Sequence, residues 1–89
     1  MSNFTGMDIA GVRQLANQFS QKADEIDGIR NFLTSQLNST QWVGNDRERF
    51  VGDWQGQYTT ALNTVVNALR EAQQTALRNA QEQETTSNS

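Results

Sequence analysis

The sequence has no cysteine, no proline and no histidine among its 89 residues. Without cysteine, no disulfide can staple the fold, and cysteine usage gives no indication of the redox compartment. The lack of histidine and cysteine removes the most common general base, the usual soft nucleophile and the usual metal ligands. We therefore predict that the protein is not an enzyme and that it has no catalytic residues and no cofactor.

Positive charge is also scarce, because the formal net charge is -3 and Lys22 is the only lysine. Nucleic acid binding needs clustered lysine and arginine, and anionic membranes attract polybasic segments. No run approaches the roughly 18 apolar residues of a membrane helix. The sequence thus predicts no nucleic acid partner and no stable membrane insertion, and it disfavours a membrane-active amphipathic peptide. Its first residues lack the basic and apolar regions of a signal peptide, so any export is expected to proceed without a cleaved leader.

Acidic residues occur in two groups, one in each half of the chain. A solvated helix face explains such groups better than a site for a hard metal ion, so we predict no metal site. The groups are Asp24, Glu25 and Asp27, and Asp46, Glu48 and Asp53.

Residues 8–38 have the pattern of an amphipathic helix. Apolar residues recur every seven positions, with others three or four positions later, which places them on one face of a helix. Asp8 is the expected N-cap, because its carboxylate can accept hydrogen bonds from free amides of the first turn. The residues expected to pack in the hairpin or in a dimer interface are Val12, Leu15, Phe19, Ile26, Ile29 and Leu33.

A second amphipathic pattern covers residues 45–80. Asn45 followed three residues later by Glu48 has the spacing of a capping box, which predicts that Asn45 caps this helix. Residues 81–89 contain no apolar side chain and are expected to form a flexible polar tail. The residues expected to pack in the hairpin or in a dimer interface are Phe50, Trp54, Tyr58, Leu62, Val65 and Leu69.

Residues 39–44 separate the two patterns and are predicted to form a turn. Gly44 can adopt a positive φ and reverse the chain where a side chain would clash. A connection this short makes two helices antiparallel neighbours. The predicted fold is therefore all-α, an antiparallel two-helix hairpin with no second domain.

Some apolar residues fall outside the main stripes, which suggests that each helix contacts more than one neighbour. The simplest arrangement is a dimer in which two hairpins pair into a four-helix bundle. The alternative is that these are isolated exposed apolar residues, which are common on protein surfaces. The residues are Phe32, Phe50, Val66 and Leu77.

The turn contains Trp42-Val43-Gly44, and this placement between two helices resembles the Trp-x-Gly motif of the WXG family. These are small ESAT-like proteins exported by bacterial type VII secretion systems. Phe50 and Trp54 stand eight and twelve residues after Trp42, where the family commonly has aromatic residues. A second Trp-x-Gly begins at Trp54, but it falls inside the helical pattern. We therefore assign the turn and secretion motif to Trp42 and Gly44.

The resemblance implies a leaderless secreted protein, cytoplasmic before export, that is a substrate or co-substrate of a type VII system. Its implied partners are itself or a paralogous small hairpin, and the secretion ATPase. The alternative is an intracellular adaptor or chaperone hairpin for a larger secreted client. Many family members also carry Tyr-x-x-x-Asp/Glu after the second helix, whereas here the last tyrosine is Tyr58 and Leu62 follows four residues later. This departure suggests that a partner supplies that part of the signal.

Overall fold

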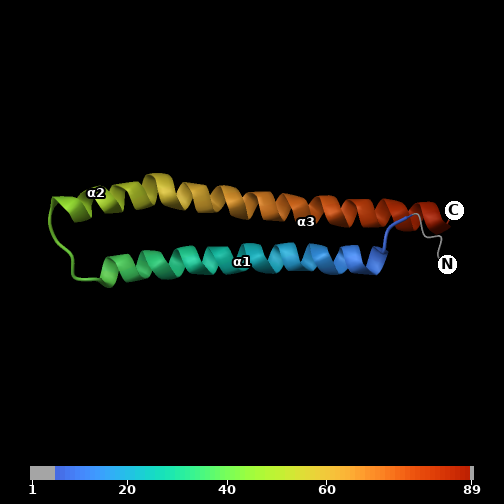
Figure 1. Ribbon diagram of the computed structural model, residues 1–89, viewed down its shortest axis with the longest axis horizontal. Coiled ribbons are helices and arrows are strands. Elements are labelled where there is room, and N and C mark those ends of the chain that lie inside the picture. Colours follow the sequence, from blue (N-terminus) through green and yellow to red (C-terminus); the bar gives the residue numbers. More distant parts are fainter. Residues whose placement is uncertain (1–5, 89) are drawn as a thin grey trace.

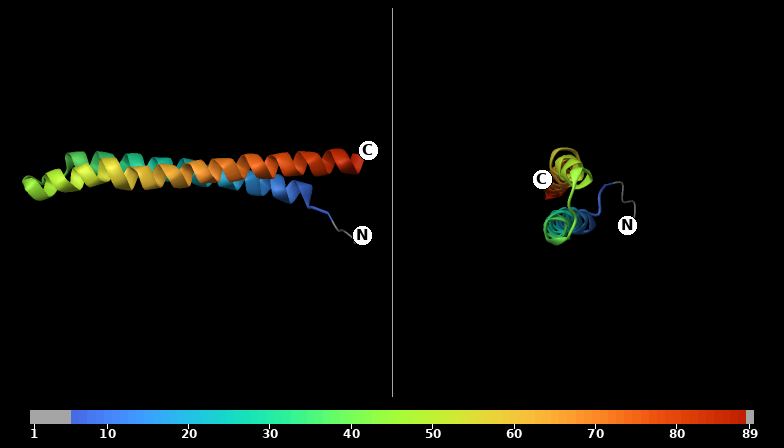
Figure 2. Two further views of the ribbon diagram at one scale, coloured as in Figure 1. Left: turned by 90° about the horizontal axis from the view of Figure 1, so that it is seen from above. Right: turned by 90° about the vertical axis from the view of Figure 1, so that its left-hand side faces the viewer.

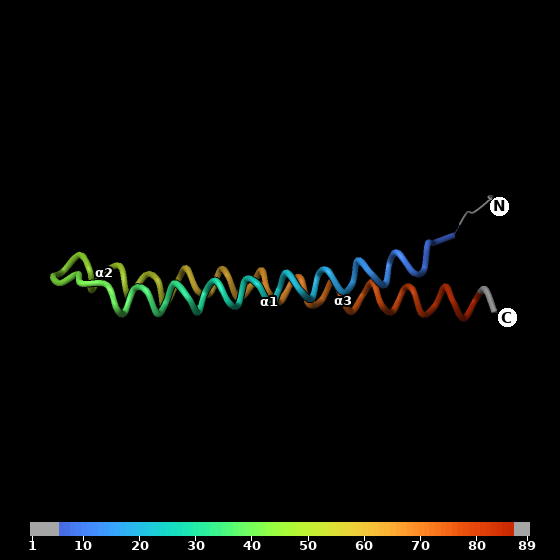
Figure 3. Tube along the Cα trace, turned by 90° about the horizontal axis from the view of Figure 1, so that it is seen from below, coloured from blue at the N-terminus to red at the C-terminus, as the bar shows by residue number. Residues whose placement is uncertain are grey.

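The computed structural model describes residues 6–88 as two long helical rods joined by a short connection (Figure 1). The first rod is α1 (Ile9–Ser39), and the second consists of α2 (Asn45–Asp53), the π-helix η1 (Trp54–Tyr58) and α3 (Thr59–Asn88). The rods run antiparallel, which confirms the predicted all-α hairpin. The connection lies at one end, and the start of α1 and the end of α3 lie at the other (Figure 3).

The hairpin is a narrow rod of 66 × 17 × 17 Å. Its end view contains only the two rods side by side, so each helix has a single helical neighbour along its length (Figure 2). Much of each helix surface therefore has no protein cover within the described residues 6–88.

Helix α1 begins as the sequence predicts. The Asp8 carboxylate accepts a hydrogen bond of 3.0 Å from the Gly11 amide, and the Asp8 carbonyl accepts one of 2.9 Å from the Val12 amide. The helix ends after Ser39 because Thr40 turns to an extended conformation with ψ 135°. The Thr40 hydroxyl donates to the Gln36 carbonyl at 2.5 Å, which satisfies one acceptor of the last turn.

The cap of α2 differs from the prediction, because Gly44 rather than Asn45 occupies the N-cap position. Gly44 has φ 120° and ψ -179°, a region of backbone space that is almost restricted to glycine. Its carbonyl accepts a hydrogen bond of 3.2 Å from the Glu48 amide, and no side chain caps this end. Asn45 is instead the first helical residue, so the capping box is not formed. Asp46 and Glu48 still place negative charge at the positive end of the helix dipole.

The π-helix η1 changes the register of the second rod. The Thr59 amide bonds to the Trp54 carbonyl, five residues back, which inserts one extra residue into the helical repeat. Val51, Tyr58 and Val65 follow one another at intervals of seven residues, but because of the inserted residue they do not stay on one face. Val51 is half-buried, whereas Tyr58 is 41% and Val65 45% exposed. The next position, Val66, turns inward instead and is only 5% exposed.

The core between the rods is made of small residues. Val66 had been placed outside the main stripe by the seven-residue repeat, and the inserted residue explains why it lies in the core. No large side chain is fully buried among the described residues, and several large apolar residues remain more than a third exposed. The buried residues are Ala16, Ala23, Val66 and Ala80.

The end of the chain also differs from the prediction, since α3 continues to Asn88 and residues 81–88 are helical. Glutamine and glutamate are good helix formers, which suits this polar stretch. It is also tied to the start of α1, because Arg13 Nη2 lies 2.6 Å from Glu84 Oε1. The parts of the leader and tail predictions that concern residues 1–5 and Ser89 lie outside the described residues.

Candidate functional site

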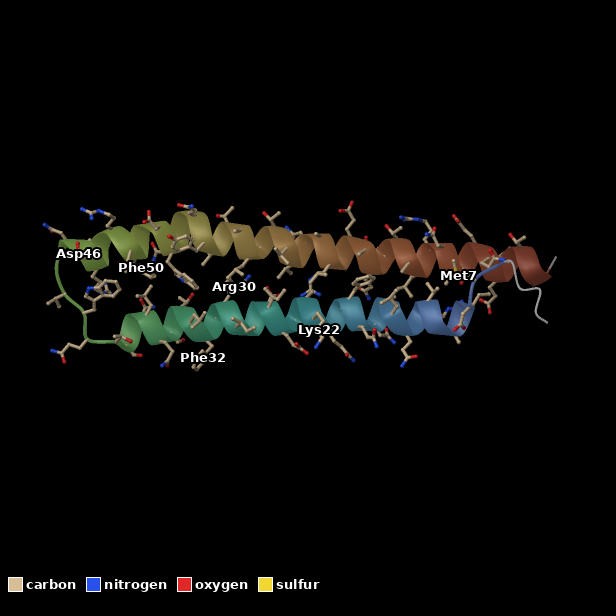
Figure 4. All side chains as sticks on the ribbon, in the orientation of Figure 1. Met7, Lys22, Arg30, Phe32, Asp46 and Phe50 are labelled. Atoms are coloured by element: carbon tan, nitrogen blue, oxygen red, sulfur yellow. The ribbon has the colours of Figure 1, made fainter. Side chains whose placement is uncertain are left out.

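On one lateral side of the hairpin, charged and polar side chains of α1 contact those of α3. Arg70 Nη2 of α3 lies 2.9 Å from Asp24 Oδ1 and 3.0 Å from Asp27 Oδ2 of α1. Arg30 Nη1 lies 2.8 Å from Asp27 Oδ1 and also donates to Asn63 Oδ1 across the gap between the rods (Figure 4). We call this the polar side, and it comprises Arg13, Asp24, Asp27, Arg30, Asn63, Arg70 and Glu84.

Electrostatic effects on the polar side follow from these pairs. The hydrogen bond and charge of Arg13 lower the pKa of Glu84, and Glu84 raises the pKa of Arg13 in turn. The hydrogen bonds from Arg70 to Asp24 and Asp27 raise the pKa of Arg70. All of these groups remain partly exposed, so each pair contributes little individually to stability. Together they align the two rods along this side.

The opposite lateral side is apolar and open. Leu15 and Ile29 lie two seven-residue repeats apart on one face of α1 and are 44% and 53% exposed. Leu33 is 42% exposed and shares a hollow with Phe50 of α2. Phe50 in turn contacts Tyr58, with ring centroids 6.1 Å apart. We call this the apolar side, and it comprises Leu15, Phe19, Ile29, Leu33, Phe50, Tyr58 and Val65.

Aromatic residues gather at the connection end of the hairpin. The rings of Trp42 and Phe50 lie 5.3 Å apart at 47°, and those of Trp54 and Tyr58 lie 6.4 Å apart. The Trp54 indole nitrogen donates a hydrogen bond of 2.8 Å to Thr34 Oγ1, which ties η1 to α1. The Thr34 hydroxyl in turn donates to the Arg30 carbonyl at 2.8 Å. A continuous aromatic contact thus runs from the turn into η1.

The motif residues Trp42 and Gly44 both lie at this tip. Trp42 is 36% exposed, because one face of its ring packs on Phe50. Val43 between them is 88% exposed. A hollow of about 300 Å³ lies beside the cluster, and it is lined by Leu33, Gln36, Leu37, Thr40, Phe50 and Trp54. The tip thus offers an aromatic edge, an exposed valine and an apolar hollow to another molecule.

The predicted packing residues divide into two equal groups. One group is half-buried, and the side chains of the other are more than a third exposed. The half-buried group is Val12, Phe19, Ile26, Trp54, Leu62 and Leu69. The exposed group is Leu15, Ile29, Leu33, Phe50, Tyr58 and Val65.

Other residues that position the site were not identified from the sequence. The cross-rod pairs made by Arg13 and Arg70 were missed, although opposite charges on facing helices are a usable signal. The sequence gives no sign that Thr34 accepts a hydrogen bond from Trp54, because that contact depends on how η1 rotates the second rod against α1. Among residues 6–88, no three acidic side chains gather in a way that could hold a metal ion. Across the same residues, no helix combines the length and the hydrophobicity that crossing a membrane requires.

Comparison with known proteins identifies the family. The family described as proteins of 100 residues with WXG matches the chain over residues 6–87. No curated protein and no solved structure matches the chain. The match covers nearly the whole sequence, and the Trp42–Gly44 motif lies at the tip of the hairpin. The chain therefore belongs to this WXG family, whose members are small proteins associated with type VII secretion.

Proposed function

We propose that this WXG protein is itself a substrate or co-substrate of a bacterial type VII secretion system and acts through pairing with another helical hairpin. It would leave the cell without a cleaved signal peptide after folding in the cytoplasm. Family membership supports the export route, and the open apolar side supports the pairing. The proposal requires no catalytic residue, since its work is recognition between protein surfaces.

The observation that carries the pairing is the exposed apolar surface of a hairpin with a very small core. The only buried apolar residues among those described are three alanines and Val66. A core of this size supplies little stabilisation at about 25 cal/mol per Å² of buried apolar surface. Covering Leu15, Ile29 and Val65 with a second hairpin would add the missing burial. Either a second copy or a paralogous hairpin could provide this cover.

The tip formed by Trp42, Val43 and Gly44 is the proposed surface for the export machinery, with the secretion ATPase as its receptor. Gly44 sets the direction of the chain as it enters α2, and Phe50 holds the Trp42 ring in place. Such a preorganised aromatic edge can be recognised at low entropic cost, because the side chain is already ordered. Residues 59–89 contain no tyrosine, so we expect a paired hairpin to supply the Tyr-x-x-x-Asp/Glu part of the signal.

Export is tested by comparing culture medium and cytosol from cells with and without the secretion ATPase. The proposal expects the protein in the medium of ATPase-positive cells only, with cytosolic marker proteins retained in both strains. Retention of the folded protein in the cytosol of both strains would contradict the proposal. That result, together with co-purification of a larger client, would instead favour the intracellular adaptor.

A further inference from the structure

The Trp42 side chain is tied to the rest of residues 6–88 by one ring contact and by no hydrogen bond. Its ring lies on Phe50, with the two centroids 5.3 Å apart. Residues 40–44 around it form neither helix nor strand, so the local backbone does not fix its direction. The orientation of Trp42 therefore depends on where Phe50 lies.

Helix α2, which carries Phe50, has few directional ties to α1. None of its residues is buried, and its one ion pair lies within the helix. From residues 41–62, a single hydrogen bond reaches α1, which the Trp54 indole nitrogen donates to Thr34 Oγ1 at 2.8 Å. Apolar contacts around the hollow at the tip also join the rods there, but such contacts are non-directional. The bond between Trp54 and Thr34 is thus the directional link that places α2 on α1.

Thr34 puts a polar group at a position that faces the second rod. It lies eleven residues after the buried Ala23, which is about three turns at 3.6 residues per turn. Its half-buried hydroxyl accepts from Trp54 and donates to the Arg30 carbonyl, so both of its bonding capacities are used. A polar group in a seam between helices specifies their register at some cost in stability. The Thr34–Trp54 pair therefore selects one alignment of the two rods.

Three aromatic contacts carry this alignment from η1 to the motif. The ring centroids of Trp54 and Tyr58 lie 6.4 Å apart, those of Tyr58 and Phe50 6.1 Å, and those of Phe50 and Trp42 5.3 Å. All three pairs are tilted or edge-on, which is the geometry that aromatic rings prefer. Tyr58 is 41% exposed, so it braces Phe50 at the surface and is not part of the buried core.

We propose that Thr34 and Trp54 are positioning residues for Trp42, so that the motif presents its indole edge correctly only while the two rods are docked. Trp42 is the group that touches the receptor. Thr34 and Trp54 act on it through Tyr58 and Phe50 without touching the receptor themselves. The inference rests on the proposed role of the tip in export, and it does not involve the apolar side of α1.

This arrangement links recognition at the tip to the state of the hairpin. A tryptophan that is already ordered loses less conformational entropy when a receptor binds it. Separation of the rods breaks the bond between Trp54 and Thr34, and Trp42 then loses the support that orders it. A receptor for the tip would therefore bind the docked hairpin in preference to a separated one.

Fluorine NMR tests whether Thr34 positions Trp42. The sequence has two tryptophans, so 5-fluorotryptophan labelling gives two signals, which Trp42→Phe assigns. Thr34→Val removes the acceptor and should shift and sharpen the Trp42 signal as the ring gains motion, whereas Thr34→Ser keeps a hydroxyl and should retain the wild-type signal. Thr64→Val is the matched control, because it removes a threonine bond of 3.0 Å to the Thr60 carbonyl outside the tip.

An unchanged Trp42 signal in Thr34→Val, with the Trp54 signal displaced, would overturn the inference. Tyr58→Leu provides a second variant that spares the buried core, because Tyr58 is exposed. It interrupts the contact between Trp54 and Phe50, and it should also shift the Trp42 signal. It decides the question even if Thr34→Val does not fold, since an unchanged signal there would overturn the inference equally.

Export provides the functional test in cells. Thr34→Val should lower the amount in the medium about fivefold, the factor that corresponds to the usual net contribution of one hydrogen bond. Thr34→Ser and Thr64→Val should be exported like wild type, and all three variants should keep their helical content by circular dichroism. A displaced Trp42 signal with undiminished export would overturn the claim that recognition depends on its position. Absence of the wild-type protein from the medium of ATPase-positive cells would instead contradict the proposed function, and the fluorine signals would still decide whether Thr34 positions Trp42.

Discussion

Replacement of Gly44 by alanine should destabilise the hairpin through the backbone alone. Gly44 has φ 120° and ψ -179°, and no atom lies within 4 Å of the position that a Cβ would occupy. Crowding therefore contributes nothing, and the cost comes from forcing an L residue into a region used almost only by glycine. Such conformations cost about 1–3 kcal/mol, which is a large share of the stability of a chain this small.

The assay is thermal or urea unfolding followed by circular dichroism at one fixed protein concentration, because pairing would make stability concentration-dependent. A loss of 1 kcal/mol should lower the midpoint by about 4–8 °C in a domain of this size. Gly52→Ala is the matched control, since Gly52 lies within α2 with open space around it and should gain about 0.5–1 kcal/mol. If both variants shift stability in the same direction, the reasoning about the turn is refuted.

Three further predictions concern the contacts between the rods. Val66→Ala should cost about 2 kcal/mol in urea unfolding, because two methyl groups leave the most buried branched side chain of the core. Trp54→Phe should cost about 1 kcal/mol in the same assay through loss of the bond to Thr34, and a Trp54→Phe, Thr34→Val double variant should cost less than the sum of the single changes. The Arg13–Glu84 pair should be pH-dependent: since Arg13 lowers the pKa of Glu84, its stabilisation is present above the ordinary glutamate pKa of 4.5 and lost as pH falls through the lowered pKa. Wild type and Glu84→Gln should therefore differ in melting temperature at neutral pH and converge in acid, and an unchanged difference would count against the pair.

Local sequence signals were sufficient to predict the hairpin and the position of its turn. Asp8 caps α1 as expected, because an N-cap depends only on residues within one helical turn. Gly44 marks the turn for a similarly local reason, namely its freedom to adopt a positive φ. The cap of α2 was misassigned by one position, since the spacing of Asn45 and Glu48 did not exclude a start at Gly44.

The packing between the rods was less predictable because it depends on contacts that are distant in sequence. The extra residue in η1 accompanies the Trp54–Thr34 bond, and nothing in the local helical pattern indicates it. That insertion turns Val66 inward and Val65 outward. The helical end of the chain was missed for the same reason, since the pairing of Glu84 with Arg13 spans most of the sequence.

The large apolar residues were expected at positions of helix packing or dimer contact, and the structure leaves half of them exposed. Hydrophobicity favours large side chains as core candidates, yet Ala16 and Ala23 are the buried residues of α1. Their small size suits a seam in which two helices approach closely. Whether a second hairpin covers Leu15 and Ile29 stays a prediction.

The most direct test of the account is a paired measurement of folding and export for Trp42→Ala. The buried residues of the core lie along α1 and α3, whereas the Trp42 ring contacts Phe50 at the tip. We therefore expect the variant to keep its helical content by circular dichroism and to disappear from the culture medium. A variant that folds and is exported normally would contradict the assignment of Trp42 to secretion, and a variant that loses its helices would show that Trp42 serves the fold instead.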